Sequence, residues 1–287
     1  MGWAIGMAAC RWEHTPPRLK RAGRSGQMDW LETNGVVLRY DLSGTGDVPL
    51  LLIHELGGSL EFWEPVLPAF QQAFRVLRFD LRGFGMSEKV KILRLDDLLG
   101  DIAGLLDALA IAQPCHVVGP ALGGGIALAF AARYPDRVRR LVVSSPATGV
   151  SPDRRGQSLQ RAEAVEREGM RVAVEQSLAR SYPERFRGDR RRFEQYRQRW
   201  LTNDPEGFAA VNRMLADMDL SQQYSRIACP TLVIGCTYDT IRPLHEVKAI
   251  AQQIPGARYV EVASGHFMPH QTPELFLETV LPFLQES

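Results

Sequence analysis

Residues 115–133 read CHVVGPALGGGIALAFAAR, and this stretch decides the fold. Its first five residues are β-rich and end at a glycine, which predicts a buried strand. Residues 124–133 are apolar and predict a helix. The two are joined directly by Gly-Pro-Ala-Leu-Gly at residues 119–123. A turn this sharp holds its middle residue, Ala121, at positive φ, and the flanking glycines leave room for it.

The alternation of strand and helix continues on both sides of this turn. From Met28 onward, short β-rich runs alternate with helical ones, which is typical of a parallel sheet covered on both faces. Between residues 94 and 111, leucine and isoleucine recur at a spacing of three and four and predict a helix on the sheet. Thr272 as N-cap and Pro273 at the first helical position predict where the last helix begins. We therefore expect an α/β fold with helices on both faces of eight mostly parallel strands, at residues 30–33, 36–41, 50–54, 75–80, 115–119, 141–145, 231–235 and 258–262.

Between residues 148 and 226 the strand-like segments are replaced by sequence that is helical in pattern and rich in arginine. Residues 151–200 alone hold 13 Arg and no Lys against 8 Asp and Glu, a local excess of +5. We interpret residues 148–226 as a helical cap inserted into a core made of residues 28–147 and 227–287. Residues 1–27 have no periodic pattern and are expected to be a flexible N-terminal extension.

Composition excludes several classes of function. The net charge of +1 is too small for a surface that holds nucleic acid or an anionic membrane. No apolar run reaches the 18 or so residues that a spanning helix needs. The four cysteines have neither CxxC nor metal-ligand spacing, which favours a reducing cytoplasm and predicts no metal site. The expected partner is a small molecule.

Four further motifs accompany the turn at residues 119–123. They are LLLIHELGG at 50–58, DLRGFGMS at 80–87, VIGCTYD at 233–239 with Pro243 beyond it, and SGHFMP at 264–269. With these motifs, residues 28–287 resemble the α/β-hydrolase superfamily, and residues 74–147 look most like its enol-lactonase and small-carboxylesterase branch. The resemblance implies an α/β-hydrolase fold and hydrolysis of an ester or lactone, with no metal and no organic cofactor.

The resemblance also implies a role for each site residue. Ala121 stands at the position of the family's nucleophile, a serine in the G-x-S-x-G motif. His266 would take the proton of that nucleophile, and Asp239 would orient the imidazole and stabilise its charged form. The backbone N–H groups of Leu56 and Leu122 would form the oxyanion hole.

This sequence departs from the family's pattern at two positions. Ala121 has no hydroxyl, so the chain as written cannot form an acyl-enzyme. Glu55 stands where many relatives have glycine, and a carboxylate pointing inward there would oppose the negative charge of an oxyanion. Glu55, Trp63 and Phe267 are candidate pocket residues. His54 is a fourth, although we expect it to be architectural.

Three interpretations of Ala121 follow. Ser→Ala is the smallest change that removes the nucleophile and keeps the turn, which favours an engineered inactive variant of a Ser-His-Asp hydrolase. The alternative is a natural enzyme without serine, in which His266 with Asp239, or Glu55, acts as a base in lyase chemistry, C–C cleavage or proton abstraction. The third is a non-catalytic receptor for a small molecule.

The remaining expectations concern polar residues near the site. The cap arginines are expected to be a solvated helical face, with one or two gripping a substrate carboxylate as the functional alternative. His270 is expected to be exposed to solvent.

Overall fold

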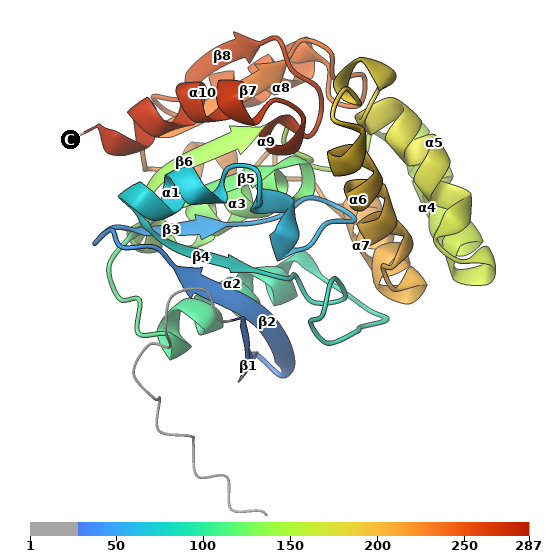
Figure 1. The fold of residues 1–287 in the computed structure, drawn as a ribbon, viewed down its shortest axis with the longest axis horizontal. Helices are drawn as coiled ribbons and strands as arrows, with labels where there is room; N and C mark the ends of the chain where they lie inside the picture. Colours follow the sequence, from blue (N-terminus) through green and yellow to red (C-terminus); the bar gives the residue numbers. More distant parts are fainter. Residues whose placement is uncertain (1–27, 287) are drawn as a thin grey trace, which may run out of the picture.

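The computed structural model describes residues 28–286, and the predicted extension at residues 1–27 lies outside them. Within the described residues, eight strands form one sheet in the order β1-β2-β4-β3-β5-β6-β7-β8 (Figure 1). The β1–β2 and β2–β4 pairs are antiparallel and the other pairs are parallel, so the predicted fold class is confirmed. The strands are β1 (Asp29–Thr33), β2 (Val36–Ser43), β3 (Pro49–Leu52), β4 (Arg75–Phe79), β5 (Cys115–Pro120), β6 (Val138–Ser144), β7 (Thr231–Cys236) and β8 (Arg258–Val262).

The order of the strands marks where a ligand can bind. The chain passes from β3 to β4 on one side of β3, and then to β5 on the other side. At such a reversal the loops after two neighbouring parallel strands diverge and leave a crevice at the carboxyl edge of the sheet. β3 and β5 are buried along their whole length, as parallel strands covered on both faces must be. The crevice therefore lies next to the turn after β5.

Helices cover both faces of the sheet, as predicted. The helices α1 (Leu67–Ala73) and α10 (Pro273–Gln285) meet on one face, where the rings of Phe70 and Phe276 lie 6.2 Å apart. The helices α2 (Leu95–Ala108) and α3 (Ala121–Arg133) pack together, and α8 (Leu244–Gln253) lies against β7 and β8. Thr272 and Pro273 begin α10 as expected. Short helical segments are η1 (Leu60–Trp63), η2 (Pro135–Arg137), η4 (Tyr224–Arg226) and α9 (Met268–Gln271).

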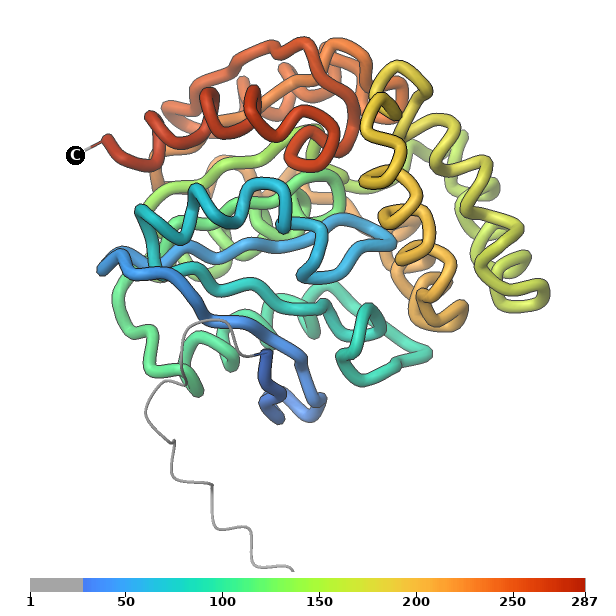
Figure 2. Tube along the Cα trace, in the orientation of Figure 1, coloured from blue at the N-terminus to red at the C-terminus, as the bar shows by residue number. Residues whose placement is uncertain are grey.

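The segment between β6 and β7 is helical, and we call its helices the cap. They are α4 (Pro152–Glu168), α5 (Arg171–Ser181), α6 (Arg190–Leu201) and α7 (Pro205–Asp217), with the short η3 (Glu184–Phe186) before α6. Figure 1 shows α6 and α7 beside the arrowheads of the strands, with α4 and α5 outside them. The tube in Figure 2 shows the same helices as a separate yellow group at this end of the sheet. None of the helices in residues 28–286 has the length and apolar character that crossing a membrane requires.

Candidate active site

The turn after β5 brings residue 121 to the carboxyl edge of the sheet. β5 ends at Pro120, α3 begins at Ala121, and the φ of Ala121 is 47°, the positive value that the sequence predicts. The helix approaches the strand so closely that a Cβ on Gly119 would lie 2.4 Å from the backbone of Gly123. A Cβ on Gly123 would lie 2.1 Å from the carbonyl oxygen of Ile53. Both glycines are therefore required by close backbone packing.

Asp239 and His266 come from the loops after β7 and β8 and contact each other. The distance from His266 Nδ1 to Asp239 Oδ2 is 2.7 Å, and both side chains are buried. The other carboxylate oxygen accepts the N–H groups of Ile241, at 2.8 Å, and Arg242, at 3.1 Å. Burial opposes ionisation of Asp239, but His266 and these hydrogen bonds lower its pKa below the ordinary value. The carboxylate therefore stays charged and fixes the imidazole, with Nε2 as the nitrogen left for chemistry.

A cavity of about 910 Å³ lies between the carboxyl edge of the sheet and the cap. Its wall brings together Ala121 and Leu122 from the turn, Leu56 from the loop after β3, and His266. Leu122 is the second residue of α3, where backbone N–H groups have no acceptor inside the helix and favour a negative charge. Residues from three loops and the cap thus line one shared cavity.

Of the four candidate pocket residues, Phe267 lines this cavity, whereas His54, Glu55 and Trp63 lie behind its wall and do not. His54 Nε2 accepts the N–H of Leu81 at 2.9 Å, and His54 Nδ1 lies 2.8 Å from the carbonyl oxygen of Glu55. Both ring nitrogens are occupied by backbone groups, which makes His54 a support for the loop. Trp63 is completely buried among core rings.

Glu55 does not place a charge beside the oxyanion position. Its side chain is fully buried, and the Tyr196 hydroxyl donates a hydrogen bond of 2.5 Å to Oε1. Burial raises the pKa of Glu55 to about 8, so this carboxyl is neutral at pH 7. Phe193, Tyr196 and Trp200 recur at helical spacing in the sequence of α6, which was the available signal that this cap helix turns an aromatic face inward.

The expectation that His270 is exposed is wrong. Only 2% of His270 is accessible, because its ring stacks on Phe62 at 5.8 Å and lies 3.3 Å from the Tyr182 hydroxyl. Burial lowers the pKa of His270 to about 3, which keeps the ring neutral. Its polar neighbours in the sequence gave no sign of the cap rings that cover it.

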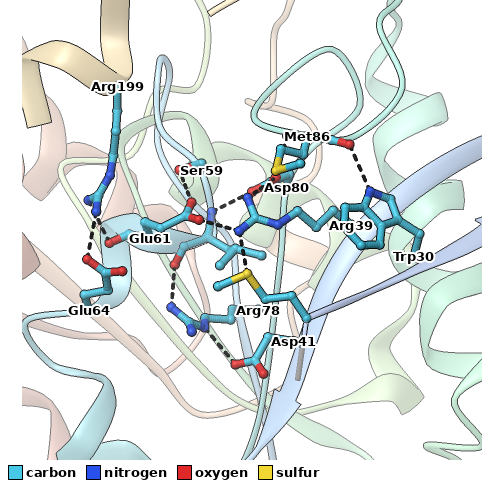
Figure 3. A network of polar contacts seen from close by, with 12 residues as sticks. Trp30, Arg39, Asp41, Ser59, Glu61, Glu64, Arg78, Asp80, Met86 and Arg199 are labelled. Carbon is cyan, nitrogen blue, oxygen red and sulfur yellow. Dashed lines mark hydrogen bonds and ion pairs between the residues drawn. The ribbon is translucent and has the colours of Figure 1, made fainter. Parts of the chain in front are cut away.

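The DLRGFGMS motif supports the site from a distance (Figure 3). The Asp80 carboxylate accepts the N–H groups of Leu60 and Met86, each at 2.7 Å, and lies 3.2 Å from Arg39 Nη1. Arg39 also pairs with Glu61 of η1. The motif thus ties the segment after β3 to the edge strands of the sheet.

Four arginines line the cavity: Arg154, Arg161, Arg180 and Arg242. Within residues 28–286 none of the four forms an ion pair, although other cap arginines pair with surface carboxylates. Arg161 donates to the Ser177 hydroxyl at 2.6 Å and lies over the ring of Phe208. Burial lowers the pKa of Arg161 to about 10. Among the cap arginines, Arg154 and Arg180 are exposed as expected, whereas Arg161 is largely buried, so the expectation of a solvated face fails for Arg161.

The comparisons with known proteins agree with this geometry. The sequence profile of the alpha/beta hydrolase fold matches residues 48–273. The 3-oxoadipate enol-lactonase 1 of Acinetobacter baylyi is 26% identical over 253 residues, which cover 88% of this chain and 94% of that protein.

Two crystal structures resemble the whole described fold. The enol-lactonase of Burkholderia xenovorans LB400 has a TM-score of 0.85 and 31% identity, over 90% of this chain and 100% of that one. A thermophilic esterase of Thermogutta terrifontis, solved with malate bound, has a TM-score of 0.84 and 30% identity, over 90% and 98% of the two chains. These relatives are hydrolases and include the enol-lactonase branch that the sequence resembles. Because the matching profile spans most of the chain, this protein belongs to the α/β-hydrolase fold family.

Proposed function

We propose that this site is built to hydrolyse an ester or lactone, with residue 121 at the nucleophile position. His266 is the base, Asp239 orients it, and the N–H groups of Leu56 and Leu122 receive the oxyanion. One observation carries the proposal: Ala121 is held in a left-handed conformation on the same cavity wall as His266, which Asp239 fixes at 2.7 Å. Alanine gains nothing from this strained conformation, which supports the view that the turn was shaped for a reactive residue.

With serine at position 121, the hydroxyl would attack the substrate carbonyl while His266 Nε2 takes its proton. The C–O bond of the leaving alcohol then breaks, His266 returns the proton to that oxygen, and water releases the acyl group by the same steps. With Ala121 this covalent route is closed. The oxyanion donors and His266 are still in place, and on their own such groups give on the order of 10³ to 10⁴-fold acceleration over water.

The second candidate is hydrolysis without serine, in which His266 activates a water molecule that attacks the carbonyl directly. Of the two bases considered for such a reaction, His266 lines the cavity and Glu55 does not, which favours His266. This candidate needs no residue beyond those already brought together.

The substitution Ala121→Ser separates these candidates. We expect it to raise kcat/KM for p-nitrophenyl esters at least 10³-fold, with a burst of p-nitrophenol that shows an acyl-enzyme. The double variant Ala121→Ser with His266→Ala is the control and should lose the gain. Turnover by the Ala121 protein that His266→Ala abolishes would instead favour the second candidate. Tight binding of ligands without turnover by either protein would make the site a receptor.

We further propose that the substrate carries a carboxylate remote from the scissile bond. The four arginines that line the cavity have no carboxylate partner within residues 28–286, and Arg161 and Arg242 are largely buried there. A buried guanidinium is favoured by a ligand anion that can accept its hydrogen bonds. The malate-bound esterase relative gives independent support, because malate is a small dicarboxylate.

A further inference from the structure

Cap helix α6 is attached to the loop after β3, residues 53–59, by a set of specific contacts. The Tyr196 hydroxyl donates to Glu55, and Asn203 Nδ2 donates to the Gly57 carbonyl oxygen at 2.6 Å. The Trp200 ring lies so close to Gly57 that a Cβ there would be 2.4 Å from it. Arg199 extends the same contact to η1, where it donates to Glu61 O at 3.2 Å and pairs with Glu64 at 2.8 Å (Figure 3).

The Glu55 carboxyl is fully buried between this loop and α6, where the Trp200 side chain also lies beside it. Its Oε2 atom lies where a Cβ on Gly58 would be only 2.1 Å away, and it has no hydrogen-bond partner within residues 28–286. Tyr196 and Arg199 are the titratable and charged groups that face it from α6, and Arg199 is already engaged by Glu64. Within the loop itself, the His54 ring faces the backbone carbonyl of Glu55. A negative charge on Glu55 would therefore be buried without an ion pair.

The backbone of Glu55 is directly connected to the oxyanion position. The carbonyl of Glu55 and the N–H of Leu56 belong to one planar peptide unit, so they turn together. That carbonyl accepts the N–H of Gly58 at 3.2 Å and lies 2.8 Å from His54 Nδ1. The Glu55 side chain leaves the backbone at the Cα that precedes this unit and joins it to Tyr196 of the cap.

We propose that the neutral carboxyl of Glu55 and the hydroxyl of Tyr196 are positioning residues that hold the Leu56 N–H toward the cavity, and that ionisation of Glu55 loosens the packing of the loop on α6, because the charge would be buried there without an ion pair. The positioning part rests on the proposed oxyanion role of Leu56. The contact between the loop and the cap does not depend on that role, so it can be tested without measuring catalysis.

The first test measures the proton on Glu55. In protein labelled with carbon-13 at the glutamate side-chain carboxyl, one resonance should titrate with a pKa of about 8 and be missing from Glu55→Gln. A Glu55 resonance that titrates near the ordinary value for glutamate would overturn the proposal.

The second test follows the contact itself by hydrogen exchange in peptides covering residues 53–60 and 190–203. After correction for intrinsic rates, protection in the unmodified protein should fall about tenfold between pH 7 and pH 9.5. Glu55→Gln keeps a neutral group of the same shape, so both peptides of this variant should remain protected at pH 7 and at pH 9.5. Tyr196→Phe should already be less protected at pH 7, and Tyr182→Phe is the matched control that keeps the original pH response. Equal alkaline loss of protection in the unmodified protein and in Glu55→Gln would contradict the proposal.

A third measurement examines positioning in the Ala121→Ser protein. We expect kcat to fall above pH 8 with little change in KM, and Glu55→Gln in the same background to remove that fall. If kcat still falls above pH 8 in the Glu55→Gln variant of the Ala121→Ser protein, Glu55 has no positioning role. Failure of Ala121→Ser to hydrolyse any ester would count against the proposed function and leave the first two tests to decide the contact. If Glu55→Gln does not fold, Tyr196→Phe supplies the comparison: it should shift the pKa of the Glu55 resonance in the first test and weaken the contact or activity in the other two.

Discussion

The backbone of Ala121 lies in the left-handed region at φ 47°, which costs a residue with a Cβ about 1 to 2 kcal/mol. The conformation persists because Gly119 and Gly123 let α3 approach β5 closely and because the Ala121 carbonyl accepts the N–H of Ala147 at 2.7 Å. The strain is therefore built into the packing around residue 121. Chemistry at this position depends on the residue placed there and on the pair formed by His266 and Asp239.

Asp239→Asn tests that pair. In the Ala121→Ser protein we expect kcat for p-nitrophenyl esters to fall on the order of 10⁴-fold, because an amide does not stabilise the charged imidazole or hold its tautomer. The fold should survive, since the amide oxygen can still accept the Ile241 N–H. Steady-state kinetics and thermal melting measure the two effects. A loss of activity below tenfold would show that Asp239 is not the partner on which His266 depends.

Glu55→Gln makes stability less dependent on pH. The pKa of Glu55 is about 8 in the folded protein against an ordinary value of 4.5, so between these values the folded state binds more protons than the unfolded state. The contribution of Glu55 to the free energy of unfolding therefore falls as pH rises from about 4.5 to 8 and levels off above it. We expect the variant to lose this slope. Its free energy of unfolding should therefore exceed that of the unmodified protein by an amount that grows with pH to a few kcal/mol, on the order that the pKa shift implies.

Urea denaturation at one-unit steps from pH 5 to pH 9 measures this difference. The comparison uses the same buffer ions throughout, because several other groups titrate in both proteins and cancel only in the difference. Parallel stability curves for the two proteins would show that Glu55 ionises equally easily in the folded and unfolded chain.

At the scale of elements, the strands and the turn after β5 could be predicted because their signals are local. β5 and β7 are mostly apolar and have glycine or proline at their ends, so the sequence predicts their bounds to within a residue or two. The environment of Glu55 could not be predicted, because its partner Tyr196 lies 141 residues away on a cap helix. His270 was placed wrongly for the same reason: its burial comes from Phe62 and Tyr182.

A prediction at the scale of elements concerns Arg161, which lies on helix α4. Arg161→Gln should weaken binding of a small dicarboxylate about tenfold to a hundredfold, which is the effect of losing hydrogen bonds to a charged group. Binding of a neutral ester of similar size should change little. Titration calorimetry measures both. Arg197→Gln is the matched control, because Arg197 pairs with Glu175 on the cap and does not line the cavity. Equal losses for the charged and neutral ligands would refute a carboxylate subsite at Arg161.

For the whole molecule, the site depends on segments that are distant in the sequence being held together. Asp80 joins Arg39 of β2 to the backbone of Leu60, and Arg199 joins the cap to the same η1 segment (Figure 3). The loop that carries Leu56 therefore lies between a buried ionic network on one side and α6 on the other. Weakening either the ionic network or the contact with α6 should disturb the site, even when no residue that lines the cavity is substituted.

Asp80→Asn tests the ionic side of this arrangement. Asp80 is fully buried, pairs with the nearly buried Arg39 and accepts the N–H groups of Leu60 and Met86, so Asp80→Asn weakens three buried charge-assisted contacts and leaves Arg39 with Glu61 alone. We expect the free energy of unfolding to fall by about 3 to 5 kcal/mol, as measured by urea denaturation at pH 7. Asp107→Asn is the matched control. It removes the same charge from the exposed Arg137–Asp107 pair and should cost about 1 kcal/mol or less. If the two substitutions destabilise the protein equally, Asp80 is not what holds the loop after β3 to the edge of the sheet.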